Sequence, residues 1–160
     1  MAKGCRSSIQ LKMLVMAALI IPSAPVEAWA SLGGDTASVQ ADQIHLQGRR
    51  SIKSAGSYTV HEIQGTAGTV VREYVSPEGK VFGVAWQGPW MPDMRQLLGT
   101  YFDQYAHANQ LEKGARIRRG PVLINEPGLV VQIGGHPRAF AGRAYVPEML
   151  PSGVRAENIQ

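Results

Sequence analysis

Three segments in the middle of the chain alternate between apolar and polar residues with the period of two that is typical of β-strands. They span residues 57–64, 69–76 and 80–87 and are rich in β-branched and aromatic side chains. The turn sequences GTAG and PEG separate them, and connections this short force neighbouring strands to pair antiparallel. The pattern therefore predicts a three-stranded antiparallel meander.

The alternation also predicts which side chains lie together on one face of each strand. The expected sets, strand by strand, are Tyr58 with Val60, Val70 with Tyr74, and Phe82 with Val84 and Trp86. The last set is large and entirely apolar, which is typical of a strand that faces the core.

A helical period follows the meander. Apolar residues recur at positions i, i+3, i+4, i+7, i+8 and i+11, which place on one stripe Met94, Leu97, Leu98, Tyr101, Phe102 and Tyr105. Pro92 suits the first turn of a helix, and the charge of Asp93 complements the helix dipole. We expect a helix over about residues 92–108, with its stripe packed against the meander.

A second group of short strands is expected in residues 121–128, 129–135 and 138–146, the last two joined around residues 134–138. The whole pattern predicts an α+β fold. It consists of the antiparallel meander and the second antiparallel group, in one sheet or in closely packed sheets, with one main amphipathic helix across a face.

The segment before the meander has a weaker pattern. Asp35 is a suitable N-cap and Gly48 a suitable C′ residue, so residues 36–47 are expected to form a helix. Residues 48–56 have the sequence GRRSIKSAG, which is typical of a polar connector that includes a short strand.

The first thirty residues carry the features of a cleavable signal peptide in their usual order. They open with positive charges and continue into the apolar run MLVMAALII, which is too short to span a bilayer. Small residues at Ala28 and Ala30 suit signal peptidase, so cleavage is expected after Ala30. The expected organisation is a signal peptide over residues 1–30 and one exported domain over residues 31–160, periplasmic or secreted, with no membrane-spanning segment left.

Composition excludes several classes of chemistry. Cys5, the only cysteine, leaves with the signal, so disulfide scaffolds and cysteine nucleophiles are excluded from the mature chain. The full chain has 16 Lys and Arg against 12 Asp and Glu. Cleavage removes three of the former and one of the latter, which leaves a net charge of +2. A nucleic-acid partner is therefore not expected.

Four segments together resemble a known family: YTVHEI, GTVVREYVSPEGKVFGVAWQGP, MRQLLGTYF and GLVVQIGGHPRAFAGRAYVPEMLPSGV. The family is a group of exported bacterial proteins known as domain of unknown function 2844. The resemblance covers nearly the whole mature chain. It implies one exported domain of about this size and assigns no activity and no catalytic residue.

Candidate catalytic groups are few. The histidines have no metal-ligand spacing, so neither a metal nor a cofactor is expected, and no catalytic residue is assigned. His61 is expected on the polar face of its strand and His107 near the end of the main helix. The pattern favours a protein without catalytic activity. It leaves open a hydrolase acting on an envelope polymer through Glu62 and Glu73, which face each other if the first hairpin pairs symmetrically, with Arg72 on the other face.

Basic residues near the second strand group form a candidate anion-binding surface. Arginine side chains bind carboxylates and phosphates through two parallel hydrogen bonds. Such a surface forms if the last hairpin lies beside the preceding loop. It would then contain Lys113, Arg116, Arg118, Arg119, Arg138 and Arg143. His136 lies in the same glycine-containing turn as Arg138 and belongs to this candidate site. An ordinary solvated loop is the alternative.

Trp90 lies in the stiff sequence QGPWMP and has two possible placements. It can fill the corner between sheet and helix, which the size of its side chain favours. Alternatively it is exposed beside Tyr58 or Tyr101 and offers a platform for a sugar or a peptide. The leading hypothesis is a non-catalytic binding or scaffolding module whose partner is another exported protein or an anionic envelope polymer. An unpaired, uncharged edge strand would be a third route to a partner.

Overall fold

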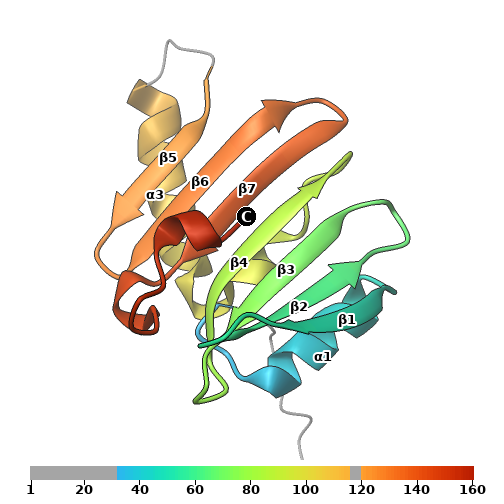
Figure 1. The fold of residues 1–160 in the computed structure, drawn as a ribbon. Coiled ribbons are helices and arrows are strands. Elements are labelled where there is room, and N and C mark those ends of the chain that lie inside the picture. Colours follow the sequence, from blue (N-terminus) through green and yellow to red (C-terminus); the bar gives the residue numbers. More distant parts are fainter. Residues whose placement is uncertain (1–31, 116–119) are drawn as a thin grey trace, which may run out of the picture.

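One antiparallel sheet of seven strands organises the protein, in the order β1-β2-β3-β4-β7-β6-β5 (Figure 1). The computed structural model describes residues 32–115 and 120–160. The strands are β1 (Arg49–Ser54), β2 (Thr59–Gln64), β3 (Val70–Val75), β4 (Val81–Gly88), β5 (Val122–Glu126), β6 (Leu129–His136) and β7 (Ala139–Tyr145). The predicted α+β fold is confirmed. Pairing of β4 with β7 joins the two strand groups into a single sheet.

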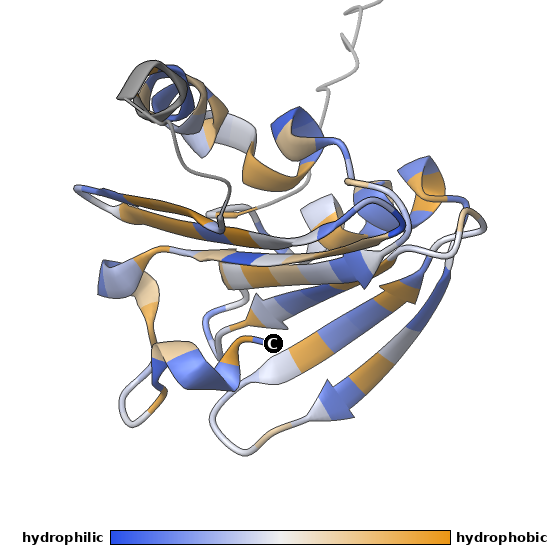
Figure 2. Cartoon of the chain, turned by 90° about the horizontal axis from the view of Figure 1, so that it is seen from above, coloured by the Kyte–Doolittle hydropathy of each residue, from blue (hydrophilic) through white to orange (hydrophobic). Residues whose placement is uncertain are grey.

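The two faces of the sheet are covered differently (Figures 1 and 2). The helices α1 (Thr36–His45), α2 (Met94–Leu98) and α3 (Phe102–Ala115) lie on one face. The C-terminal segment, which contains the 3₁₀ turns η2 (Pro147–Met149) and η3 (Ala156–Asn158), lies on the other. We call these the helix face and the open face. Among the described residues, no helix has the length and apolar character needed to cross a bilayer.

The apolar stripe of the main helix packs as predicted. Leu97, Leu98 and Tyr105 are buried in the core of the helix face, and the other stripe residues pack against it. The main helix predicted over about residues 92–108 is confirmed, but it is interrupted: α2 ends at Leu98, and its C-cap is Gly99, whose φ is 48°. The turn η1 (Gly99–Tyr101) then leads into α3, which continues to Ala115. His107 therefore lies in the middle of α3 and not near its end.

Phe82 does not lie on the predicted face of β4, because a β-bulge interrupts the regular alternation of side chains there. In the β3–β4 ladder Phe82 has no partner between two consecutive pairs, so it points to the opposite face from Val84 and Trp86. It is buried in a second core on the open face, beneath the C-terminal segment. That core also contains Tyr58 and Val60, which share one face as predicted.

The first helix begins where the sequence predicted and ends earlier. The side chain of Asp35 caps α1 by accepting hydrogen bonds from the N–H groups of Ala37 and Ser38. The residue with positive φ after the helix is Gln47, at 47°, and not Gly48. Gly48 is needed for close packing and not for its backbone conformation, because a Cβ there would lie 2.7 Å from Ile63 Cγ2.

Candidate functional site

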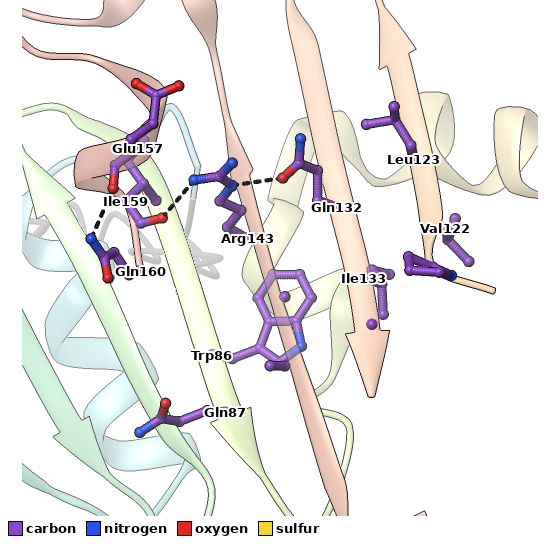
Figure 3. A pocket seen from close by; sticks show the side chains of 14 residues that line it. Trp86, Gln87, Val122, Leu123, Gln132, Ile133, Arg143, Glu157, Ile159 and Gln160 are labelled. Atoms are coloured by element: carbon purple, nitrogen blue, oxygen red, sulfur yellow. Dashed lines mark hydrogen bonds between the residues drawn. The ribbon is translucent and has the colours of Figure 1, made fainter. Parts of the chain in front are cut away.

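A hollow of about 620 Å³ opens on the open face, between the C-terminal segment and the start of β5 (Figure 3). Strands β4, β5, β6 and β7 all contribute to its lining, together with Glu157, Ile159 and Gln160. Chain segments that are far apart in sequence therefore meet here, and only the order of strands in the sheet brings them together.

Small residues create this hollow. Ala141 of β7 lies directly opposite Gln87 of β4 on one side and Gly134 of β6 on the other. Directly paired residues share a face of an antiparallel sheet, so the three form a row across it. A Cβ added at Gly134 would meet no atom within 4 Å. The row is low at its centre because Ala141 and Gly134 place almost no side-chain volume above the sheet.

The next row of paired residues, which contains Gln132 of β6 and Arg143 of β7, forms one wall of the hollow. Arg143 Nε donates to Gln132 Oε1 at 2.8 Å, and Arg143 Nη1 donates to the carbonyl oxygens of Ala156 at 2.7 Å and Ile159 at 3.2 Å. Figure 3 shows the guanidinium between Gln132 and the C-terminal segment. Because the oxygen of Gln132 is occupied, its amide N–H₂ is the group that remains to donate to a ligand.

Trp86 and Gly142 lie beneath the hollow, on the helix face of β4 and β7. A Cβ at Gly142 would lie 2.3 Å from Trp86 Cζ2, so only glycine permits the indole to lie against β7. Trp86 is buried, and its Nε1–H has no hydrogen-bond acceptor among the described residues. A buried donor of this kind is unusual in a folded protein.

The hollow has the chemistry of a binding site. The described residues of its lining carry apolar side chains, three glutamines, one arginine and one glutamate, and they include no Ser, Thr, Cys, His, Asp or Lys. Nucleophilic catalysis requires a nucleophile beside a base, and general acid–base catalysis requires positioned proton donors and acceptors. Apolar walls with a few polar groups that converge on the space are instead typical of ligand pockets.

The carboxylates expected for a hydrolase do not come together. Glu62 lies opposite Arg72 on the open face, where Arg72 Nε donates to Glu62 Oε2 at 2.8 Å. This hydrogen bond lowers the pKa of Glu62. Glu73 lies opposite His61 on the helix face. The symmetric pairing expected from the sequence is wrong by one residue, and one step of register moves a side chain to the other face.

Glu73 instead meets Asp42, which α1 places over the sheet. The two carboxyl groups are within hydrogen-bonding reach, and Gln96 Nε2 donates to Asp42 Oδ1 at 2.7 Å. Burial is the main cause that raises the pKa of both groups, and for Glu73 the rise is large. The exposed fractions are 0% for Glu73 and 1% for Asp42. Helix α1 thus closes the pair off from any substrate.

His61 is also buried, which corrects its expected place on a polar face. It points to the helix face of β2, and burial lowers the pKa of its imidazole. Within residues 32–115 and 120–160, no three His, Cys, Asp or Glu side chains come together in a group that could hold a metal ion.

The size of the Trp90 side chain favoured a place in the corner between sheet and helix, but the side chain does not lie there. Its exposed fraction is 59%, although its backbone is held by Thr69 Oγ1, which donates to the Trp90 carbonyl at 3.1 Å. Tyr58 packs edge-on against Phe82, near the opposite end of β4. A joint platform of Trp90 and Tyr58 is therefore not formed.

The predicted basic surface is only partly placed. Arg116, Arg118 and Arg119 lie outside the described residues. Arg138 and His136 are exposed at the turn between β6 and β7, where Arg138 has a φ of 71°. Arg143 binds the C-terminal segment, so its guanidinium is not part of an open patch.

Sequence reasoning missed the residues that define the hollow. Gln87, Gln132 and Ala141 carry no motif, and their neighbourhood depends on the register between strands. The one available signal was the occurrence of small residues inside strand patterns, above all Gly134, because glycine in a strand marks a place where something else approaches closely.

Fold and site together define an α+β protein with one helix-covered sheet face and one partly open face that carries a hollow. The family model described as Protein of unknown function (DUF2844) matches residues 28–159, and the chain belongs to this family. Neither a curated protein nor a solved structure matches the chain.

Proposed function

We propose that the protein is a non-catalytic binding module of the bacterial envelope that holds an envelope component or another exported protein. The observation that carries this proposal is the hollow on the open face, with its low row of Ala141 and Gly134 and its wall of Arg143 and Gln132. The lining offers apolar contact and amide hydrogen bonds, which suit recognition of a largely uncharged ligand surface.

The distribution of titratable groups supports binding over catalysis. The buried carboxyl groups of Asp42 and Glu73 and the buried imidazole of His61, whose pKa values are shifted, lie on the helix face. The hollow is on the opposite side of the sheet from these three groups. Tyr74, whose pKa burial raises, faces the open side, and its hydroxyl is bound to the backbone of Gln160. The alternative of a hydrolase using Glu62 and Glu73 is less well supported, because the two carboxylates lie on opposite faces of the sheet. Among the described residues, no other acid–base pair lines the hollow.

The envelope location is part of the proposal and rests on residues 1–30. Their charge pattern, apolar run and small residues at Ala28 and Ala30 are those of a secretory signal. Amino-terminal sequencing of the protein recovered from the envelope fraction tests this directly. We expect the mature chain to begin at Ser31, and an intact Met1 would contradict export by cleavage.

The binding proposal is tested with three immobilised proteins: wild type, Gly134→Leu and Asn125→Leu. A Cβ at position 134 meets no atom within 4 Å, so a leucine there projects into the hollow. Asn125 is exposed on β5 on the same face and lies outside the lining. Each is incubated with envelope extract, and retained proteins, glycans and lipids are identified by mass spectrometry. We expect one component to be retained by wild type and Asn125→Leu and lost by Gly134→Leu. Equal recovery by all three would contradict the proposal.

A further inference from the structure

The hollow continues into two further depressions on the open face. One, of about 440 Å³, lies toward the β6–β7 turn and is lined by Val70, Pro89 and Arg138, and it shares Gln87 and Ala141 with the first. Another, of about 570 Å³, is lined by Lys53, Glu62 and Arg72, and it shares Gln87 and Gln160 with the first. Gln87 therefore lies where all three meet.

Register defines the long axis of this combined depression. The directly paired residues Gly134, Ala141, Gln87 and Val70 line these depressions and form one row across β6, β7, β4 and β3. We call this row and the space above it the trough. Neighbouring strands are about 4.8 Å apart, so three steps span roughly 14 Å. An extended chain rises about 3.3 Å per residue, so the trough matches about four residues.

The open face already holds a stretch of polypeptide beside the trough. Arg143 donates to the backbone carbonyls of Ala156 and Ile159, and Tyr74 Oη donates to the carbonyl of Gln160 at 2.7 Å. The side chain of Ile159 is fully buried against the same face. Side-chain donors that bind carbonyls, together with one apolar anchor, are thus how this face binds a chain without adding a strand.

The same elements are present along the trough. Gln132 and Gln87 offer amide groups that pair with a peptide backbone, and the low row over Ala141 and Gly134 leaves room for small apolar side chains. Arg138 lies at the β6–β7 turn, beside the row and not at either of its ends, and it forms no ion pair among the described residues. An acidic group on the ligand would complement this charge. No tryptophan belongs to the row: Trp86 is buried on the helix face, and the exposed Trp90 lies in the loop after β4.

We propose that the trough binds an extended polypeptide segment of about four residues from another protein, with small apolar side chains over Ala141 and Gly134 and an acidic group near Arg138. This inference rests on the proposed function and specifies its ligand. The bound segment lies across the strands and beside the C-terminal segment, which makes the same kinds of contact on the same face.

The test is a selection from a phage-displayed library of random heptapeptides on wild-type protein, with removal of binders to Gly134→Leu. Enriched peptides are labelled with fluorescein and their affinities measured by fluorescence polarisation. We expect them to share small residues and one acidic residue. We expect Kd to rise at least about tenfold in both Gly134→Leu and Ala141→Leu, and to stay unchanged in Asn125→Leu. Arg138→Ala should raise Kd by roughly three- to tenfold, because a charge-assisted hydrogen bond is lost.

Circular dichroism and thermal unfolding of each variant establish that it is folded before its affinity is compared. Failure to enrich any peptide over Gly134→Leu would overturn the inference, as would affinities that both filling variants leave unchanged. If no peptide is enriched while a glycan or a lipid from envelope extract is lost by Gly134→Leu, the inference fails and the proposed function stands. If the extract also shows equal recovery with all variants, both fail.

Discussion

The carboxyl groups of Asp42 and Glu73 face each other in the interior of the protein, across the contact between α1 and β3. If both were ionised, both oxygens of Glu73 and Oδ2 of Asp42 would have no hydrogen-bond donor among the described residues. Holding two negative charges this close in a medium of low dielectric constant is costly, which agrees with the raised pKa of both groups, so we expect the pair to keep a proton. Such a shared proton would link α1 to the sheet.

Stability should depend on this proton. The pKa of Glu73 in the folded protein is raised well above 4.5. The protonated pair therefore makes its full contribution to the free energy of unfolding below about pH 4.5. This contribution is lost as the pH rises through the pKa of Glu73 in the folded protein. We expect the free energy of unfolding to fall with rising pH in this range, by at most about 1.4 kcal/mol per pH unit for each proton. Urea denaturation at a series of pH values measures this slope.

Glu73→Gln provides the control, because it is neutral at every pH and its amide can donate to Asp42. Other charges near the pair are those of His45 and Asp93 beside Asp42, and of Arg50 beside Glu73. His61 has a lowered pKa, and below about pH 6.5 it produces a slope of the opposite sign. These other charges are present in both proteins, so their effects cancel when the slope of the variant is subtracted from that of wild type. A slope that persists unchanged in Glu73→Gln would contradict the shared proton.

Two glycines on neighbouring strands should respond to alanine in opposite ways. Gly142→Ala places a methyl group against the ring of Trp86 and should lower the free energy of unfolding by about 1–3 kcal/mol. Gly134→Ala meets open space and should be neutral or should stabilise by up to about 1 kcal/mol. Thermal unfolding measures both, and tryptophan emission reports any displacement of the indole. Equal effects of the two substitutions would contradict the close packing of Trp86.

The apolar seam of the main helix should carry much of the stability. Leu98 has an exposed fraction of 0%, so Leu98→Ala leaves a cavity and should cost about 2–5 kcal/mol. Leu111 of α3 is 62% exposed, and Leu111→Ala should change the free energy of unfolding by less than about 0.5 kcal/mol. Chemical denaturation of both variants gives the comparison. A small effect at Leu98 would mean that the helix does not seal the core.

Arg143 should control the order of the C-terminal segment. Arg143→Met removes the donors to Ala156 and Ile159 and should cost about 2–4 kcal/mol, because hydrogen bonds from a charged group are lost. Hydrogen exchange should then accelerate at the amide of Ile159. Arg138→Met is the matched control, since Arg138 is an exposed arginine of the same hairpin. Unchanged exchange in Arg143→Met would show that other contacts hold the segment.

Two of the predictions from the sequence are wrong because the pairing between strands differs from the pairing that was assumed. The β2–β3 loop sets the register one residue away from the symmetric arrangement, and this single step separates Glu73 from Glu62. The bulge at Phe82 likewise reverses one expected face. Trp90 was misplaced for another reason: residue size favours burial on average, but the loop after β4 holds its backbone and leaves its ring outside.

The sequence by itself determined the strands, most of the turns between them and the apolar stripe of the main helix, because these follow from local periodicity and from the conformational preferences of proline and glycine. Tertiary structure decided three things: that the two strand groups form one sheet, that Glu73 meets Asp42, and that small residues of separate strands align into a trough. Each depends on the register of strands far apart in the chain. A period of two shows that side chains alternate between faces, but it does not show which distant residue lies opposite.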